Sequence, residues 1–206
     1  MRIENIIGLY RNLSLRQRLY LKARYLISPV KTIEEAVPQS GRIYDVGCGA
    51  GLLSNIIASE SSARRVTGMD LSGEKIAIAR KSLNGRDNIE FEIGDALNFR
   101  FDKPDAFVMS DMLHHMPFGM QEELLRRIYG SLNKGGVLVM QDIDITPLYK
   151  YIFALSVDKV LNSMASVYYR RSSDWRDVIK AIGFVVESEK IGKGYPIAAV
   201  IYRCVK

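Results

Sequence analysis

The chain has little of what disulfide frameworks, metal clusters and membrane spans require. Its 206 residues contain two cysteines, Cys48 and Cys204, and two histidines, His114 and His115. Two cysteines cannot build a disulfide framework, and no cysteine–histidine cluster has the spacing of a zinc or iron–sulfur site, so radical chemistry is not supported. Charged residues interrupt the first 40 positions, so we expect neither a signal peptide nor a spanning segment. These absences predict a cytoplasmic protein.

Acidic residues are scarce at the N-terminus. Residues 1–31 carry seven basic residues against Glu4 alone, an excess that equals the formal net charge of the whole chain, +6, so residues 32–206 are balanced. The basic residues alternate with Leu, Ile and Tyr, as in a basic amphipathic helix. Residues 1–40, the N-terminal arm, therefore allow two interpretations: a helix packed over the domain edge with a solvated basic face, or peripheral contact of residues 1–31 with an anionic membrane at its inner face. Nucleic acid is a weaker candidate, because no RNA-binding module accompanies the arm.

The most informative run that the chain does contain is residues 45–51, Asp-Val-Gly-Cys-Gly-Ala-Gly. It follows a strand-like segment, residues 42–44, and opens a helix-like one, residues 52–58. Glycines at alternate positions let the backbone turn tightly and approach a ligand that a Cβ atom would block, and the first N–H groups of the helix point into the same space. A small side chain is wanted at Cys48, so we expect no nucleophile there. The residues of this turn expected at the ligand are Gly47, Cys48, Gly49 and Gly51.

Acidic residues follow three successive strand-like segments. Asp45 ends the first, where an anionic pyrophosphate is repelled and a cationic amino-acid ligand is welcome. Leu52 stands where the dinucleotide fingerprint requires a further glycine. Asp70 ends the next strand, where one carboxylate accepts both hydroxyls of a ribose, and Asp95 follows the third strand, placed to receive an adenine amino group. These positions argue against a plain dinucleotide site.

This joint pattern resembles the class I S-adenosylmethionine-dependent methyltransferase family, from about residue 41 to the C-terminus. The resemblance implies S-adenosylmethionine as cofactor, S-adenosylhomocysteine as product, and a methyltransferase domain over residues 41–206. A plain nucleotide-binding Rossmann domain is the alternative. The cofactor-binding residues that the resemblance implies are Asp45, Gly47, Cys48, Gly49, Gly51, Asp70, Leu71, Asp95, Ala96 and Ser110.

Strand-like and helix-like segments alternate beyond the arm, which predicts a parallel sheet covered by helices. Ser72 and Ser173 stand where helix N-caps are expected. A hairpin across residues 192–196 adds an antiparallel strand, as is typical of the family. The prediction is an α/β fold: a Rossmann-like three-layer sandwich with a mostly parallel seven-stranded sheet, a C-terminal antiparallel hairpin and an N-terminal helical arm. The expected strands are residues 42–44, 65–70, 89–93, 106–109, 137–141, 184–186 and 197–202.

Residues 146–171 interrupt the alternation after the fifth strand. Ligands bind at this carboxyl edge in open α/β sheets, and the segment is apolar on more than one face. We predict that it is a lid over the acceptor substrate; an ordinary packing helix is the alternative. The predicted substrate-binding residues are Asp142, Tyr149, Tyr168 and Tyr169.

The two histidines follow the fourth strand at the same edge. An imidazole there could deprotonate a hydroxyl near neutral pH, so His114 and His115 are the catalytic candidates; alternatively, they cap and pack this turn. Asp111, Asp142 and Asp144 could form an oxygen-rich Mg²⁺ site. Carboxylates that orient substrate or cap loops are the favoured interpretation, and no metal is predicted.

The reaction class follows from the cofactor. Methyl transfer from a sulfonium depends mainly on positioning the acceptor, with a base only where the acceptor must lose a proton. Residues 110–113, Ser-Asp-Met-Leu, do not match the Asn/Asp-Pro-Pro-Tyr motif of enzymes that methylate amino groups of nucleobases and glutamine. The hypothesis is an S-adenosylmethionine-dependent methyltransferase acting on a small or lipid-like molecule, at oxygen rather than nitrogen. An RNA methyltransferase and a non-catalytic cofactor-binding partner domain are the alternatives.

Overall fold

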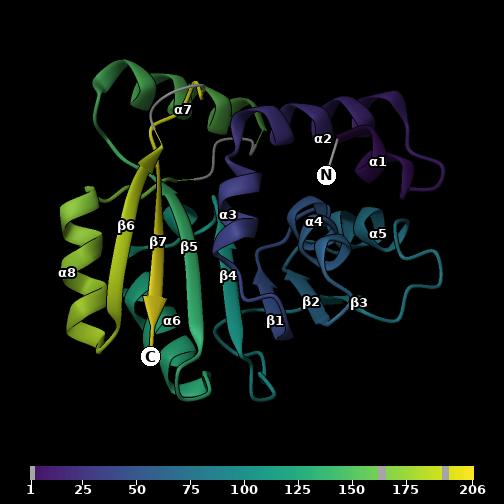
Figure 1. The fold of residues 1–206 in the computed structure, drawn as a ribbon. Helices are drawn as coiled ribbons and strands as arrows, with labels where there is room; N and C mark the ends of the chain where they lie inside the picture. The colour runs from purple at the N-terminus through teal and green to yellow at the C-terminus, as the bar shows by residue number, and fades with distance from the viewer. Residues whose placement is uncertain (1–2, 162–165, 192–194) are drawn as a thin grey trace.

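A seven-stranded sheet forms the central layer of the computed structural model, which describes residues 3–161, 166–191 and 195–206 (Figure 1). The strand order is β3-β2-β1-β4-β5-β7-β6. β7 pairs antiparallel with β5 and β6, and the other pairs are parallel, so the predicted mixed sheet is confirmed. The strands are β1 (Gly41–Val46), β2 (Arg64–Asp70), β3 (Ile89–Ile93), β4 (Ala106–Ser110), β5 (Val137–Ile143), β6 (Val185–Ile191) and β7 (Ala199–Val205).

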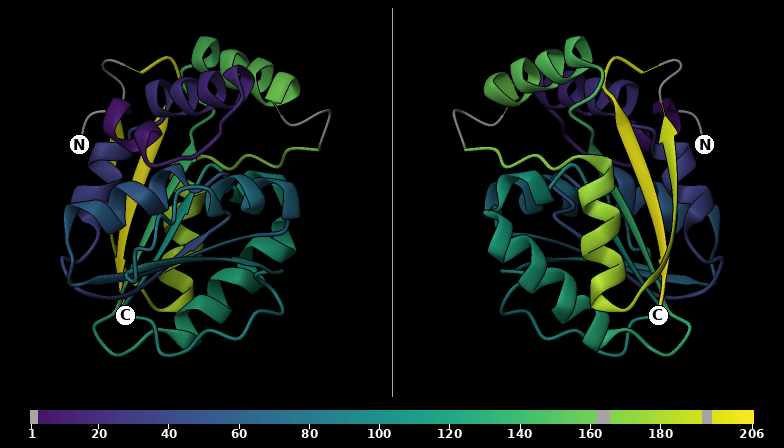
Figure 2. Two further views of the ribbon diagram at one scale, coloured as in Figure 1. Left: turned by 90° about the vertical axis from the view of Figure 1, so that its right-hand side faces the viewer. Right: turned by 90° about the vertical axis from the view of Figure 1, so that its left-hand side faces the viewer.

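Helices cover both faces of this sheet, which confirms the three layers (Figure 2). Alternate side chains of β4 enter two separate cores: Val108 lies in one with Ile57 of α4, and Phe107 in the other with Leu124 of α6. α3, α4 and α5 belong to the first core, and α6 and α8 to the second. The helices are α1 (Ile3–Gly8), α2 (Leu15–Ile27), α3 (Val30–Ala36), α4 (Leu52–Glu60), α5 (Gly73–Arg80), the 3₁₀ helix η1 (Leu113–His115), α6 (Phe118–Ser131), α7 (Leu148–Leu161) and α8 (Ser172–Ile182).

One of the two predicted serine caps is present. The hydroxyl of Ser72 accepts a hydrogen bond from the backbone N–H of Lys75 at 3.3 Å and caps α5. The prediction for Ser173 is wrong, because α8 begins before this residue and Arg171 occupies its N-cap without a side-chain capping bond. The serines at positions 172 and 173 both lie inside the helix, so neither of them is its N-cap.

The C-terminal hairpin lies later in the chain than predicted. β6 and β7 each span seven residues, whereas the sequence suggested 184–186 and 197–202. β7 pairs along its whole length with β5, from Ala199 opposite Ile143 to Val205 opposite Val137. Because this ladder includes the exposed Arg203, β7 extends beyond the apolar run that hydropathy indicates. Residues 192–194 of the predicted turn lie outside the described residues.

The N-terminal arm packs onto the first core. Ile6 and Tyr10 are buried, and the Tyr10 hydroxyl donates a hydrogen bond to the carbonyl oxygen of Ala50 at 2.8 Å. α2 lies above the carboxyl ends of the parallel strands, and α7 lies above the same edge, as Figure 2 shows from two sides. None of the helices in the described ranges is both long and apolar enough to cross a membrane. The inner side of the arm is thus packed against the rest of the domain.

Candidate cofactor and acceptor site

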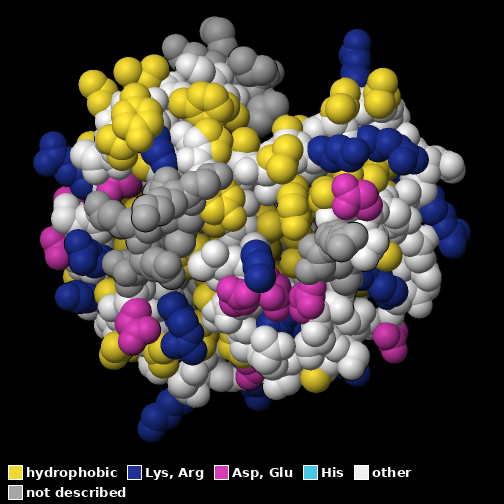
Figure 3. Space-filling model, turned by 45° about the horizontal axis from the view of Figure 1, so that its top comes forward, with side chains coloured by type: hydrophobic (Ala, Val, Ile, Leu, Met, Phe, Trp, Pro, Cys, Tyr) yellow, Lys and Arg dark blue, Asp and Glu magenta, His cyan; other side chains and the backbone are white. Residues whose placement is uncertain are grey.

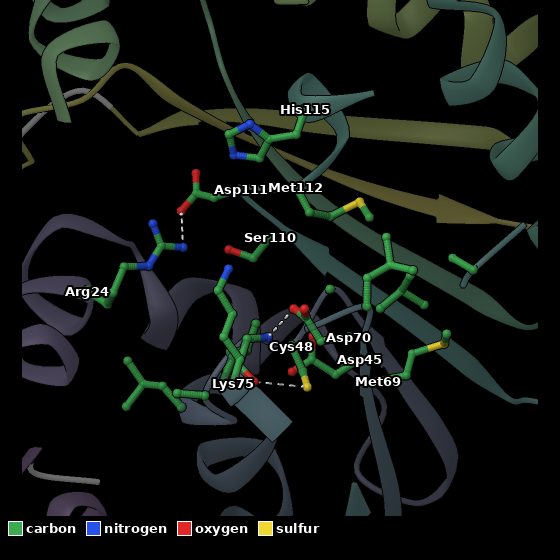
Figure 4. A pocket seen from close by; sticks show the side chains of 18 of the residues that line it. Arg24, Asp45, Cys48, Met69, Asp70, Lys75, Ser110, Asp111, Met112 and His115 are labelled. Carbon is green, nitrogen blue, oxygen red and sulfur yellow. Dashed lines mark hydrogen bonds and ion pairs between the residues drawn. The ribbon is translucent and has the colours of Figure 1, made fainter. Parts of the chain in front are cut away.

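A cavity of about 450 Å³ opens at the carboxyl ends of the parallel strands, the edge where we expected the ligand. Its walls come from the β1–α4 turn, the ends of β2, β3 and β4, the start of α6 and the inner face of α2 (Figure 4). Nine of the ten predicted cofactor residues line this cavity, and Gly51 does not. The fold thus gathers side chains from Asp45 to Ser110 around one space.

The three glycines of the β1–α4 turn have different roles, although all have positive φ values: +75° at Gly47, +57° at Gly49 and +78° at Gly51. A Cβ atom on Gly51 would lie 2.6 Å from the ring of Phe91, so this glycine allows close packing inside the domain. A Cβ atom on Gly47 would lie 2.9 Å from the Cβ of Met112. Gly49 has no atom within 4 Å of that position and lines the cavity, so it provides the open cradle at which a ligand can meet the backbone.

Asp70 is held rigidly at the cavity wall. Its Oδ2 accepts a hydrogen bond from the N–H of Gly49 at 2.9 Å, and its Oδ1 accepts one from the N–H of Ser72 at 2.8 Å. Each carboxylate oxygen has a further lone pair. The side chain is therefore fixed in orientation and retains acceptor capacity for two hydroxyl groups, as its predicted ribose-binding role requires.

Asp45 is fully buried beneath the same turn. Its Oδ2 accepts a hydrogen bond from the Ser54 hydroxyl at 2.5 Å. Burial raises the pKa of Asp45 from 3.8 to about 7; the Ser54 hydrogen bond opposes this shift, and the nearby charge of Asp70 adds to it. A cationic group at this end of the cavity would lower the pKa again. Asp45 is thus suited to the positively charged amino-acid end of a ligand.

Cys48 and Asp95 line the cavity beside Asp45 and Asp70. Burial raises the pKa of the Cys48 thiol well above its ordinary value, so the side chain stays neutral, consistent with the expectation that it is not a nucleophile. The Asp95 carboxylate accepts hydrogen bonds from the N–H of Leu97 at 3.0 Å and from the Asn98 amide at 2.7 Å. It therefore stabilises the turn after β3 while it lines the cavity.

These residues suit S-adenosylmethionine. The open cradle at Gly49, the fixed carboxylate of Asp70 and the buried acid at Asp45 lie along one cavity. Gly49 allows a ligand to approach the backbone closely, Asp70 can accept hydrogen bonds from a ribose, and Asp45 can pair with a cationic amino-acid group.

The arm contributes a wall that the sequence analysis missed. Tyr20, Leu21, Arg24 and Ser28, on and just after α2, line the cavity. Nη2 of Arg24 donates a hydrogen bond to Oδ2 of Asp111 at 3.1 Å, an ion pair that joins α2 to the end of β4. In the sequence, Arg24 is one of several basic residues on an amphipathic helix, and nothing marks it as the residue that faces inward.

Asp111 is the centre of a small polar network. Its Oδ1 accepts a hydrogen bond from the Gln141 side-chain amide at 2.9 Å, and the Ser110 hydroxyl donates to Oε1 of Gln141 at 2.7 Å. Asp111 also has a φ of +52°, in the left-handed region that aspartate adopts more readily than most other residues. The network fixes the floor of the cavity between the cofactor residues and the start of α6.

The two adjacent histidines lie in different environments. His115 lines the cavity and is shown at its upper end in Figure 4. His114 is completely buried, and its Nδ1 lies 2.6 Å from Oδ1 of Asp142. The His114 ring also stacks on Tyr169, with ring centroids 4.6 Å apart, and lies 4.3 Å from the His115 ring. His115 is thus the histidine that a substrate can reach, and His114 belongs to the layer that supports it.

The four predicted acceptor residues are not brought to the cavity. Asp142 and Tyr169 pack around His114, and Tyr168 packs edge-on against Phe118. Tyr149 is 70% exposed on the outer face of α7. None of the four lines the cavity, which α2 borders. Residues 162–165 of the predicted lid at 146–171 lie outside the described residues.

The end of the cavity near His115 is apolar and rich in methionine. Met112, Met116, Pro117 and Met120 line it, with Met120 40% exposed at the rim. Methionine side chains adapt to irregular apolar shapes because they are unbranched and polarisable. This half of the cavity suits an apolar molecule better than a highly charged one.

The contacts of the acidic side chains also bear on the Mg²⁺ site considered from the sequence. Asp111 is paired with Arg24, Asp142 contacts His114, and Oδ1 of Asp144 accepts a hydrogen bond from the N–H of Thr146 at 3.4 Å, so all three acids considered for Mg²⁺ have protein partners. In the part of the chain that the structure describes, no group of three or more His, Cys, Asp or Glu side chains has the arrangement of a metal site. Each of these carboxylates holds a neighbouring group of the chain in place.

Comparison with known proteins agrees with this architecture. Residues 43–136 match the family model described as a methyltransferase domain. The chain is 30% identical over 144 residues to a ubiquinone biosynthesis O-methyltransferase of Xanthomonas campestris pv. campestris (strain B100), a match that covers 66% of this chain and 57% of that relative. The chain thus spans little more than half the length of this curated relative.

Solved structures show the same fold. An O-methyltransferase family protein from Burkholderia thailandensis superimposes with a TM-score of 0.74 at 18% identity, over 91% of this chain and 58% of that chain. An S-adenosylmethionine-dependent methyltransferase from Mesorhizobium loti superimposes with a TM-score of 0.69 at 18% identity, over 85% of this chain and 96% of that chain. The glycine turn, the ordered acids, the sheet topology, the match to a methyltransferase domain over residues 43–136 and the related sequences together indicate a class I S-adenosylmethionine-dependent methyltransferase.

Proposed function

We propose that this protein transfers the methyl group of S-adenosylmethionine to an oxygen atom of a small, lipid-like acceptor. The observation that carries this proposal is the position of His115 at the apolar end of a cavity whose other end holds Gly49 and Asp70. The similarity to a ubiquinone biosynthesis O-methyltransferase supports oxygen as the methylated atom.

Each part of the cavity has a role in this reaction. S-adenosylmethionine supplies a methyl group that its sulfonium has already activated. Asp70 and the glycine turn hold the cofactor, while Met112 and Met116 surround the acceptor and keep water away from it. Fixing two reactants in this way removes most of the entropic cost of their encounter.

His115 is the proposed general base. Its imidazole would accept the proton that the acceptor hydroxyl loses as the new carbon–oxygen bond forms. The methyl–sulfur bond would break in the same step, with S-adenosylhomocysteine as the leaving group, and histidine is suited to accept a proton near neutral pH. His114 would position it, because the His114 ring is fixed between Asp142 and Tyr169 and lies against the His115 ring. His114 is therefore a positioning residue in this proposal.

Transfer of a labelled methyl group into three pools tests the proposal: a lipid extract, an RNA pool and a protein pool, each with the intact protein and the His115→Asn variant. We expect label in the lipid extract that chemical analysis places on oxygen, with much less in the variant. Label in RNA would favour an RNA methyltransferase. Cofactor binding without label in any pool would favour a non-catalytic partner domain.

A further inference from the structure

The outer face of α2 is apolar although it faces away from the domain. Leu15, Leu19 and Leu26 are 72%, 57% and 68% exposed. Their spacings of four and seven residues place them on one side of the helix. Leu21 and Arg24 point the other way, where Leu21 is buried and Arg24 pairs with Asp111. Packing of the inner face therefore fixes the leucine stripe toward the outside.

α7 presents a second outward apolar face. Leu148, Tyr149, Ile152 and Phe153 are all exposed, from 42% to 70%. The opposite side of α7 is anchored, because Ala154 is buried and Nζ of the buried Lys150 donates a hydrogen bond to the carbonyl oxygen of Tyr195 at 2.8 Å. This helix, too, is fixed with its apolar side away from the domain.

Both faces belong to one edge of the molecule. Figure 2 shows α2 and α7 above the carboxyl ends of the strands from both sides, and Figure 3 shows apolar side chains gathered there. Eleven of the twelve large apolar side chains that are exposed within the described ranges lie at or just after the carboxyl ends of strands or on these two helices. Val185, at the amino end of β6, is the exception. Scattered exposure would not produce such a one-sided distribution.

The charged residues around the leucine stripe indicate which kind of partner this surface fits. Arg16 lies on one flank of the leucine stripe and Arg18 and Lys22 on the other, and all three are exposed. Residues 5–33 and 145–157 contain no aspartate or glutamate. Apolar residues flanked by cations match the boundary between acyl chains and anionic headgroups of a bilayer. A second copy of the same face would bring like charges together, and exposed leucines add nothing to a phosphate-binding surface.

We propose that α2 and α7 together dock the protein on an anionic bilayer, with their outer apolar side chains at the headgroup–acyl boundary. α2 then has two sides with two roles, because its inner face lines the cavity through Tyr20 and Leu21. Docking would place the cavity beside the membrane. The docking itself does not depend on which acceptor is methylated, and α7 adds a contact that the charge pattern of residues 1–31 did not indicate.

Vesicle co-sedimentation tests the docking surface. We expect the intact protein to sediment with vesicles of phosphatidylcholine and phosphatidylglycerol and far less with phosphatidylcholine alone. The variant Arg16→Glu/Arg18→Glu/Lys22→Glu should bind the mixed vesicles at least about 100-fold more weakly. The variant Leu148→Ser/Ile152→Ser/Phe153→Ser should bind roughly 30-fold more weakly or worse, and the binding that it retains should remain sensitive to salt.

Matched controls come from the opposite edge of the molecule. Arg65→Glu/Lys134→Glu/Lys180→Glu makes the same change in net charge at exposed positions of β2, the turn before β5 and α8. Val185→Ser removes the exposed apolar side chain of that edge. Both controls should keep vesicle binding within about twofold of the parent, since screening weakens distant charges. Unchanged cofactor affinity by calorimetry shows that each variant is folded.

Three results would overturn the proposal. The intact protein does not prefer the anionic vesicles, or the two charge-reversed variants lose binding equally, which would make net charge the cause. Alternatively, gel filtration shows a dimer that the α7 variant disrupts while vesicle binding is unaffected, which would assign the face to a second copy of the chain. A failure here leaves the proposed methyl transfer intact, because that reaction is read from label and not from sedimentation.

Discussion

The cofactor half of the cavity comes from one contiguous turn and two acids that end neighbouring strands, whereas the acceptor half is assembled from α2, η1 and α6. In the first half, sequence position and spatial position coincide, because the carboxyl ends of parallel strands meet at one edge. In the second, residues from Tyr20 to Met120 meet only through tertiary packing. The half proposed to bind the cofactor is thus visible in the sequence, and the half proposed to hold the acceptor is not.

The largest expected effect separates the two histidines of the acceptor half. We expect His115→Asn to lower kcat by roughly 100-fold or more, with nearly unchanged cofactor affinity, because a general base acts only in the transition state. His114→Asn should instead lower thermal stability, since it disturbs the buried contact with Asp142. Steady-state kinetics, calorimetry and thermal melts distinguish the two. Normal turnover of the His115 variant would show that positioning alone suffices.

The next largest effect is expected for Asp70, whose carboxylate is fixed in the cofactor half of the cavity. Asp70→Ala should weaken S-adenosylmethionine binding by roughly 2–3 kcal/mol, because two ribose hydroxyls lose a charged acceptor. Asp95→Ala should have a smaller effect, since apolar contacts also hold the adenine. Calorimetry on folded variants measures both. Equal affinity in the parent and the Asp70 variant would contradict the assignment of this half.

A pH titration examines Asp45 in the same half. The pKa of this carboxyl is about 7 without a bound cation and should fall when a cation lies beside it. Cofactor affinity should therefore weaken by about tenfold for each pH unit below about 7, with protons released on binding. Calorimetry in buffers of different ionisation enthalpy detects this release. Asp45→Asn is the control, which should bind weakly with no such pH dependence; a parent that releases no proton would argue against a cation at Asp45.

The smallest expected effect concerns the junction between the halves. Arg24→Met removes the ion pair with Asp111, which is partly exposed, so the cost should be about 1 kcal/mol. Amide hydrogen exchange should speed up in α2 while β1 stays protected, and cofactor affinity should fall by less than in the Asp70 variant. Exchange in α2 that equals the parent's would show that leucine and tyrosine packing alone holds the helix.

Sequence reasoning succeeded where a local rule coincided with the final contact. The Ser72 cap, the glycine turn and the order of the acids depend on backbone geometry within a few residues. It failed where the helix N-cap lies two residues before the expected one, as at Ser173, or where a long ladder extended a strand past its apolar residues, as at Arg203. Hydropathy could not separate these cases, because pairing and packing energies exceed the local preferences.

The lid over residues 146–171 stays a prediction. Residues 146–171 read as an apolar cover for the site because they follow β5 at the carboxyl edge. In the structure, the exposed apolar side chains of α7 face outward, and α2, from the other end of the chain, lines the cavity. Amphipathicity reports that a helix has two faces, but not which face meets the domain.

By itself, the sequence determined the family, the sheet and the cofactor half, since alternation, glycine placement and strand-end acids act locally and in register. The tertiary structure decided which histidine reaches the cavity, which helix covers it and which apolar faces stay outside. His114 and His115 are adjacent in the chain, yet one turn of 3₁₀ helix directs one into a contact with Asp142 and the other to the cavity. Such choices depend on the packing of segments far apart in sequence, because no local preference distinguishes the two directions.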